Sequence, residues 1–166
     1  MDLEGVFKTA VKVFERKGRH APMVIAESSD GKVSMLMVPS MDPELKYTVL
    51  TTIGAVLKEE GFRPGTVFFA SEFWFATIPV EGSEEGRSLL AGKKKVSDCD
   101  DKTEALCVIA SSGRGDFRSM SADIKRGECG KPFVMLDKKD EISMMKSAII
   151  DYIWDGYGLP PEATKN

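Results

Sequence analysis

The most constraining feature of the sequence is the unbroken run Thr66–Pro79, TVFFASEFWFATIP. It is rich in aromatic and β-branched residues and lies between Pro64-Gly65 and Pro79, a pattern typical of a long strand. Because both faces of this strand are mostly apolar, we expect both to be covered, with the strand in the middle of a sheet. The rest of the chain should fold around it.

Glu72 is the residue in this run that does not suit an apolar strand. We expect it to be largely out of bulk water, where a carboxylate is costly unless it has a partner or takes up a proton. The candidate partners are Arg118, His20 or a backbone N–H freed by a bulge. Glu72 therefore has either a structural partner or a functional role.

Hydrophobic periodicity and turn residues define the other elements. They predict helices over 2–17 (capped by Asp2 and ended by Gly18), over 42–61 and from Asp140 to Gly156. The second helix should turn one stripe inward: Leu45, Thr48, Val49, Thr52, Ile53, Val56 and Leu57. Strands are predicted over 22–28, 32–39, 103–111, 117–125 and 132–137.

The resulting element order is α-β-β-α-β-β-β-β-α. Hairpin-length turns make the strand pairs antiparallel, so the order predicts an α+β fold, a single antiparallel sheet of about five or six strands with three helices packed on it. We expect one domain over 1–158. Residues 80–102 should form an exposed, mobile loop because they are rich in Gly, Ser and charge, and 159–166 a flexible tail.

Composition argues against several classes of function. The chain of 166 residues has 23 Lys plus Arg and 26 Asp plus Glu, a net charge of −3, which is against binding to nucleic acid or an anionic membrane. It lacks an apolar run long enough to span a bilayer. Three cysteines without C-x-x-C spacing predict free thiols in the cytoplasm, and with a single histidine they predict neither a metal site nor a cofactor.

Glu72 and Glu104 are the only carboxylates that invite an acid–base interpretation. A hairpin register with Pro79 opposite Thr103 would place them roughly 20 Å apart, too far to act on one bond. The following meander instead predicts that Glu104 lies near Asp123 or Lys125 across the turn at 113–115, and a Glu104–Lys125 cross-strand pair is expected. The sequence also lacks a G-x-S-x-G elbow, so it favours a binding protein over an enzyme.

Two segments resemble a pattern found in small uncharacterised proteins of microbial and phage genomes. S-E-F-W at 71–74 and V-S-D-C-D-D-K-T-E-A-L at 96–106 are similar to an S-E-x-W strand followed by P-S-E-x-P-x-R-x-E-x-L. Valine and aspartate stand at 96 and 101, where that pattern has proline. The matching residues are Ser71, Glu72, Trp74, Ser97 and Glu104. The resemblance covers about a quarter of the chain and implies no activity, but it links Glu72, Trp74 and Glu104.

Two hypotheses for function follow. The first is a binding or regulatory module that acts through self-association or a protein partner. Met35, Leu36, Met37 and Met41, on or just after the second strand, favour a homodimer, because methionine-rich surfaces often bind. The alternative is a small-molecule-binding protein or enzyme with Glu72 in a pocket beside Trp74. The candidate ligand-binding residues are Ser71, Glu72, Trp74, Glu104 and Arg118.

Overall fold

The fold was analysed in a computed structural model, which describes residues 1–39, 42, 44–76, 83–91, 93–126, 132–135 and 148–158. The elements are α1 (Leu3–Lys17), β1 (Met23–Ser28), β2 (Val33–Met37), α2 (Lys46–Glu59), β3 (Pro64–Ala76), α3 (Glu84–Leu90), the short 3₁₀ helix η1 (Val96–Asp98), β4 (Lys102–Gly113), β5 (Asp116–Arg126), β6 (Pro132–Met135) and α4 (Ala148–Tyr157).

The strands form one six-stranded sheet in the order β2-β1-β3-β4-β5-β6, and every neighbouring pair is antiparallel. The predicted α+β class and single antiparallel sheet are confirmed. The run that begins at Pro64 is the third strand from the β2 edge, between β1 and β4. It thus occupies the interior position that its apolar faces require.

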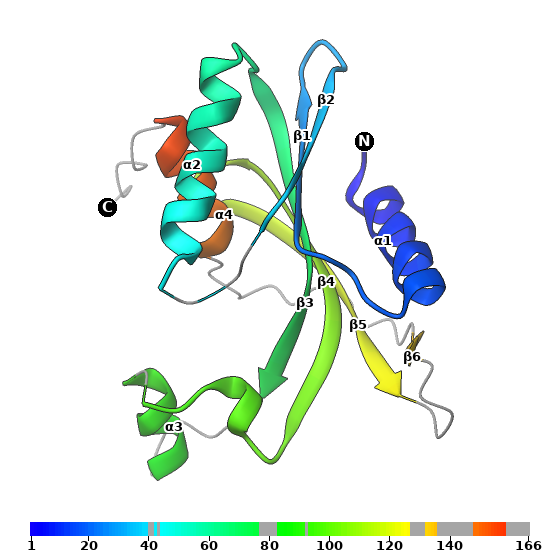
Figure 1. The fold of residues 1–166 in the computed structure, drawn as a ribbon, viewed down its shortest axis with the longest axis vertical. Helices are drawn as coiled ribbons and strands as arrows, with labels where there is room; N and C mark the ends of the chain where they lie inside the picture. Colours follow the sequence, from blue (N-terminus) through cyan, green and yellow to red (C-terminus); the bar gives the residue numbers. More distant parts are fainter. Residues whose placement is uncertain are drawn as a thin grey trace.

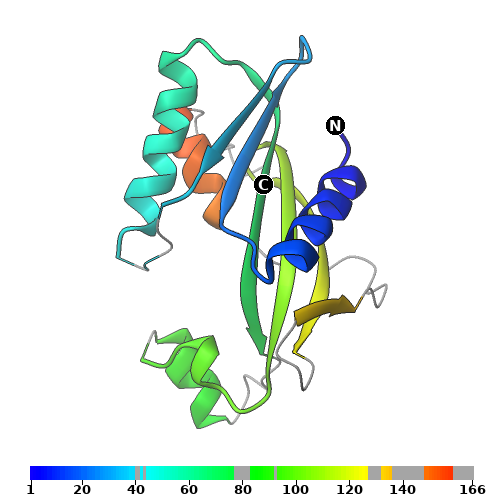
Figure 2. The same ribbon diagram turned by 45° about the vertical axis from the view of Figure 1, so that its right-hand side comes forward.

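Helices cover both faces of the sheet, so the molecule has three layers (Figures 1 and 2). On one face α1 packs on β3, β4 and β5, and its Phe14 shares a core with Phe68 and Leu106. On the other face α2 and α4 form the second core, which includes Leu50 and Trp154. These are the three helices predicted to pack on the sheet.

α1 has the predicted boundaries because both of its ends are capped. The Asp2 side chain accepts a hydrogen bond from the Gly5 N–H at 2.6 Å. Gly18 adopts a left-handed φ of 72°, and its N–H bonds the Phe14 carbonyl at 2.6 Å. Glycine is the residue that tolerates this conformation, so the chain turns out of the helix there.

α2 begins later than predicted and turns a different stripe inward. Asp42 caps the turn before the helix, which itself begins at Lys46. Leu45, Thr48 and Thr52 were expected inside but are exposed, and the Thr52 hydroxyl instead bonds the Thr48 carbonyl at 2.7 Å. The buried residues of the helix are Leu50, Ile53, Gly54 and Leu57.

Glycines set the contact between α2 and α4. A Cβ on Gly54 would lie 2.0 Å from the Ile153 carbonyl oxygen, and one on Gly156 would lie 1.8 Å from the Thr51 carbonyl oxygen. The two backbones therefore touch directly at these positions. This contact places Gly54 on the buried side of α2. The predicted stripe missed it, because that prediction considered only apolar side chains.

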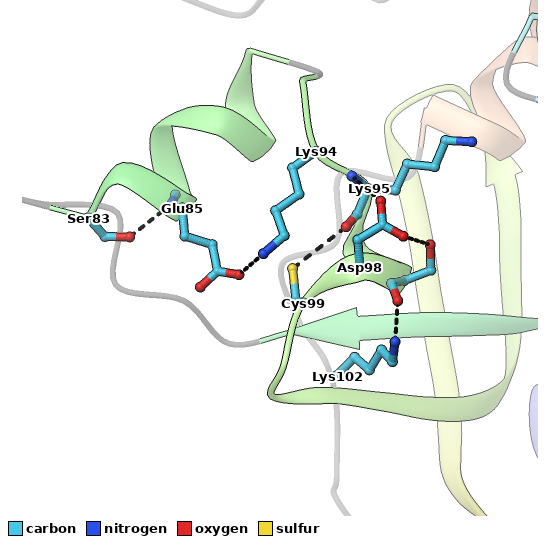
Figure 3. Close-up of polar contacts among 9 residues, drawn as sticks. Ser83, Glu85, Lys94, Lys95, Asp98, Cys99 and Lys102 are labelled. Carbon is cyan, nitrogen blue, oxygen red and sulfur yellow. Dashed lines mark hydrogen bonds and ion pairs between the residues drawn. The ribbon is translucent and has the colours of Figure 1, made fainter.

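The segment predicted as a mobile loop contains a helix. Ser83 accepts a hydrogen bond from the Gly86 N–H at 2.9 Å and caps α3, which begins with Glu84 and Glu85. A Glu85–Lys94 ion pair ties α3 to the segment before η1 (Figure 3). Serine at the cap and glutamates in the first turn are signals for a helix start. The prediction of a loop instead followed the high content of glycine and charged residues in this segment. α3 lies at the far end of the β3–β4 pair, away from the three packed helices (Figure 1).

Several predictions fall on residues outside the described part of the chain. These are Met41, residues 77–82, the start of the last helix near Asp140 and the tail at 159–166. Within the described part, no helix is long and apolar enough to cross a membrane.

Candidate functional site

The polar residues of β3 and β4 meet at one end of the α1 face. Trp74 lies opposite Glu104, and Glu72 lies opposite Leu106, which packs in the α1 core. Glu72 and Glu104 are therefore diagonal neighbours on the same face. The predicted register, with Pro79 opposite Thr103, is wrong: Thr103 pairs with Phe75. β3 ends at Ala76, and α3 and η1 belong to the connection rather than to the strands.

Glu72 is half-buried, and its main partner is backbone. Its Oε1 accepts a hydrogen bond from the His20 backbone N–H, so the expectation that His20 would be a partner is confirmed through the main chain. Burial raises the pKa of the Glu72 carboxyl, and the charge and a side-chain hydrogen bond of Glu104 raise it further. The His20 N–H and the Arg126 charge oppose this shift. Glu72 and Glu104 thus form a carboxyl pair in which the charge of Glu104 helps Glu72 to keep its proton.

Arg126 holds the other member of this pair. Its Nε and terminal nitrogen donate to the two Glu104 carboxylate oxygens at 3.0 and 2.6 Å, a bidentate ion pair. The prediction that Lys125 pairs with Glu104 is wrong. Because Ala105 lies opposite Asp123, Glu104 shares its face with Arg126, and Lys125 points to the other face.

Trp74 continues the same face toward the end of the sheet. Its side chain is 44% exposed, so the expectation that both faces of β3 are covered throughout fails here. The Lys102 ammonium lies 5.5 Å from the centroid of the indole, a cation–π distance. Trp74, Glu72 and Glu104 are therefore together, as the sequence suggested.

Two other predicted site residues lie elsewhere. Ser71 is buried on the opposite face, and its hydroxyl donates to the Glu72 carbonyl at 3.2 Å. Arg118 pairs with Ala110, four positions along β4 from Leu106 and thus roughly 13 Å from the level of Glu72. Arg118 cannot be the partner of Glu72 at that separation. The basic residues at the site are Lys102 and Arg126, which no spacing in the sequence marked.

A cavity of about 460 Å³ lies beside this cluster. Residues from the C-terminal half of α1, the following segment, β1 and β2 line it: Val13, Lys17, Arg19, His20, Ala21, Met23 and Met37. The sequence predicted a pocket beside Trp74, but neither Glu72 nor Trp74 belongs to this lining. His20 connects the two places, because its backbone bonds Glu72 while the residue lines the cavity.

The His20 ring is buried, with only 7% of the residue exposed. Its Nδ1 has no hydrogen-bond partner of good geometry among the residues that the structure describes. Burial lowers the pKa of the ring, a backbone interaction with Ala21 opposes this shift, and the charge of Lys17 lowers the pKa further. The imidazole is therefore neutral near pH 7 and carries an unsatisfied polar atom.

Two of the three cysteines lie in the described part of the chain. Cys99 and Cys107 are free and buried, as expected of unpaired thiols, and burial raises the pKa of Cys107 to about 12. Cys129 lies outside the described residues. Across the described ranges, no group of three or more His, Cys, Asp or Glu could hold a metal ion.

Comparison with known proteins assigns no family. No family model matches the chain, and neither a curated protein nor a solved structure matches it. Function must therefore be inferred from the carboxyl pair, the cavity and the exposed apolar residues of the sheet.

Proposed function

We propose that the protein is a cytoplasmic binding module that self-associates as a homodimer through β2. The observation that carries the proposal is the exposed apolar surface of this strand, which lies at one edge of the described sheet. Met35 is 62% exposed, and Val33 and Met37 are also exposed large apolar residues. The free thiols of Cys99 and Cys107 support the reducing compartment.

The apolar surface continues from β2 onto β1. Met35 pairs with Ile25, and Met37 pairs with Met23. Ile25 packs against the α1 core, so its cross-strand neighbour Met35 lies on the same face of the sheet. α1 makes its main contacts with β3, β4, β5 and β6, and Met35 and Met37 stay exposed. The result is a contiguous apolar patch, a feature that marks binding surfaces.

The edge of β2 favours pairing with another strand. An outer strand presents backbone N–H and C=O groups, and proteins usually protect it with lysine, proline or a bulge. The β2 sequence, VSMLM, has no charged residue and no proline. Two copies paired antiparallel about Met35 would place Val33 of one beside Met37 of the other. This self-complementarity favours a second copy, and a different protein partner is the other occupant to test.

Sedimentation of the purified protein tests the proposal. At about 100 μM the wild-type chain should sediment with twice its 18.2 kDa mass, and Met35→Lys should be a monomer. Leu45→Lys is the matched control, because Leu45 is also exposed but lies before α2. A monomeric wild type would refute self-association. Equal dissociation by the control would refute the β2 surface.

The second candidate function is small-molecule binding, and the cavity beside His20 is the observation that favours it. The sequence alone favoured a ligand at Glu72 and Trp74. The lining residues instead favour a ligand beside His20. The carboxyl pair would then be its neighbour.

A further inference from the structure

We infer that the cavity beside His20 binds a small amphipathic carboxylate, an apolar chain that ends in one carboxyl group. This inference goes beyond the proposed function, because it requires no second copy, although the cavity shares Met37 with the β2 surface. Three observations carry it: an apolar lining, two cations in the wall and the unpartnered buried Nδ1 of His20.

The lining suits an apolar body. Val13, Ala21, Met23 and Met37 supply apolar surface from α1, the following segment and the two strands. The volume of about 460 Å³ falls within the range of about 300–1,000 Å³ common for small-molecule sites. Methionine side chains adapt to irregular shapes, so two of them can close on a flexible chain.

The polar groups suit one negative charge. Lys17 and Arg19 are exposed residues of the wall, where each can reach a carboxylate while its charge stays in water. The Nδ1 of His20 is closed to solvent, so the ring must shift toward the cavity before this atom, in the tautomer that protonates it, can donate to a carboxylate oxygen. A ligand oxygen there would satisfy an atom that otherwise costs free energy.

The position at the end of α1 argues against a doubly charged head group. α1 ends at Lys17, and the carbonyl end of a helix carries partial negative charge. Glu72 also lies close, because it bonds the His20 backbone. Phosphate sites usually use a helix N-terminus, which supplies free N–H groups. A carboxylate demands less positive potential than a phosphate and fits this wall better.

Octanoate is a suitable probe, with three matched comparison ligands. Octan-1-ol retains the chain without the charge, acetate retains the charge without the chain, and octyl phosphate changes the head group. Calorimetry should give octanoate the highest affinity, with octan-1-ol about tenfold weaker, the loss typical of one charge-assisted contact. Because His20 is the only histidine, its imidazole NMR signals are unambiguous. They should shift with octanoate and stay unchanged with acetate.

Variants place the ligand in the cavity. Val13→Phe should fill the space and weaken octanoate binding by about tenfold or more, since the chain would lose its volume. His20→Phe removes Nδ1 but keeps the backbone donor to Glu72, and it should weaken octanoate more than octan-1-ol, because the hydrogen bond to a carboxylate is charge-assisted. Lys17→Gln should weaken octanoate by several-fold. Lys12→Gln, on the same helix but outside the lining, should not.

The outcomes separate this inference from the dimer proposal. Octanoate binding that is unchanged by Val13→Phe, or equal affinity for octanoate and octan-1-ol, would overturn the inference. Tighter binding of octyl phosphate would overturn the choice of head group. Val13→Phe should sediment like the wild type, and Met35→Lys should bind octanoate normally. Failure of one proposal can therefore be told from failure of the other.

Discussion

Replacing Glu72 with glutamine should stabilise the protein at pH 7. Glutamine keeps an oxygen for the His20 N–H, and its amide can donate to the Glu104 carboxylate. The substitution removes the repulsion between two carboxylates. It strands no cation, because Arg126 is held by Glu104. This outcome is the opposite of the loss expected when a buried, ion-paired glutamate is neutralised.

The magnitude follows from the position of the carboxyl pair. Two like charges about 4 Å apart near a protein surface repel by about 4 kcal/mol at an effective dielectric constant of 20. Glu72 is only half-buried and Arg126 is close, so screening reduces the net gain to about 1 kcal/mol. For a chain of this size, that free energy corresponds to a rise in Tm of about 2–4 °C.

The pH dependence of stability is a second test of whether Glu72→Gln stabilises the protein. The pKa of Glu72 in the folded protein is raised above its ordinary value of 4.5. Between pH 4.5 and that raised pKa, the folded state therefore binds more protons than the unfolded state. The free energy of unfolding of the wild type should therefore fall as the pH rises through this range, and that of the glutamine variant should not fall for this reason. The two proteins should melt alike near about pH 4 and differ at pH 7.

Thermal unfolding of both proteins across this pH range is the assay. Glu15→Gln, an exposed position on α1, is the control and should change stability by less than about 0.5 kcal/mol. A loss of about 3 kcal/mol in the Glu72→Gln variant at pH 7 would refute the argument. It would mean that Arg126 depends on Glu72 and that the carboxyl pair is a structural ion-pair network.

Two further predictions concern the core. Gly54→Ala should destabilise the protein by about 2 kcal/mol in urea unfolding, because its Cβ would lie 2.0 Å from the Ile153 carbonyl oxygen, a clash that outweighs the better helix propensity of alanine; unchanged stability would contradict the close contact of α2 and α4. Cys107 should resist a thiol reagent at pH 8 in the folded protein and react once unfolded, because burial raises its pKa to about 12; native labelling mapped to Cys107 would contradict its burial.

Local signals in the sequence predicted much of the fold. Asp2 and Gly18 mark the ends of α1 because their capping bonds are made within one turn of the chain. Asp30-Gly31 marks the β1–β2 hairpin in the same way, and Gly31 has the positive φ that such a turn requires. Local signals could not predict which face of α2 is buried, since the contact with α4 determines it.

The candidate site was predictable only in part, because it depends on register. Glu72 is conspicuous in an apolar strand, so the sequence alone identifies it. Its relation to Glu104 changes with every residue by which β3 slides against β4, and the helical connection between them hid the true register. Arg126 stayed unnoticed for the same reason, since nothing in its neighbourhood predicts that it faces Glu104.

The place of Glu72 follows from a mismatch of lengths. The 15 residues of α1 span about 22 Å, whereas the 13 residues of β3 span about 43 Å, so one helix cannot cover the whole strand. Beyond the end of α1 the face must become polar or be covered by another partner. Glu72 lies at that boundary, where the chain leaving α1 at Gly18 brings the His20 N–H to its carboxyl. The out-of-place carboxylate therefore marks where the helix cover ends, and the cavity lies at the same boundary because the helix stops there.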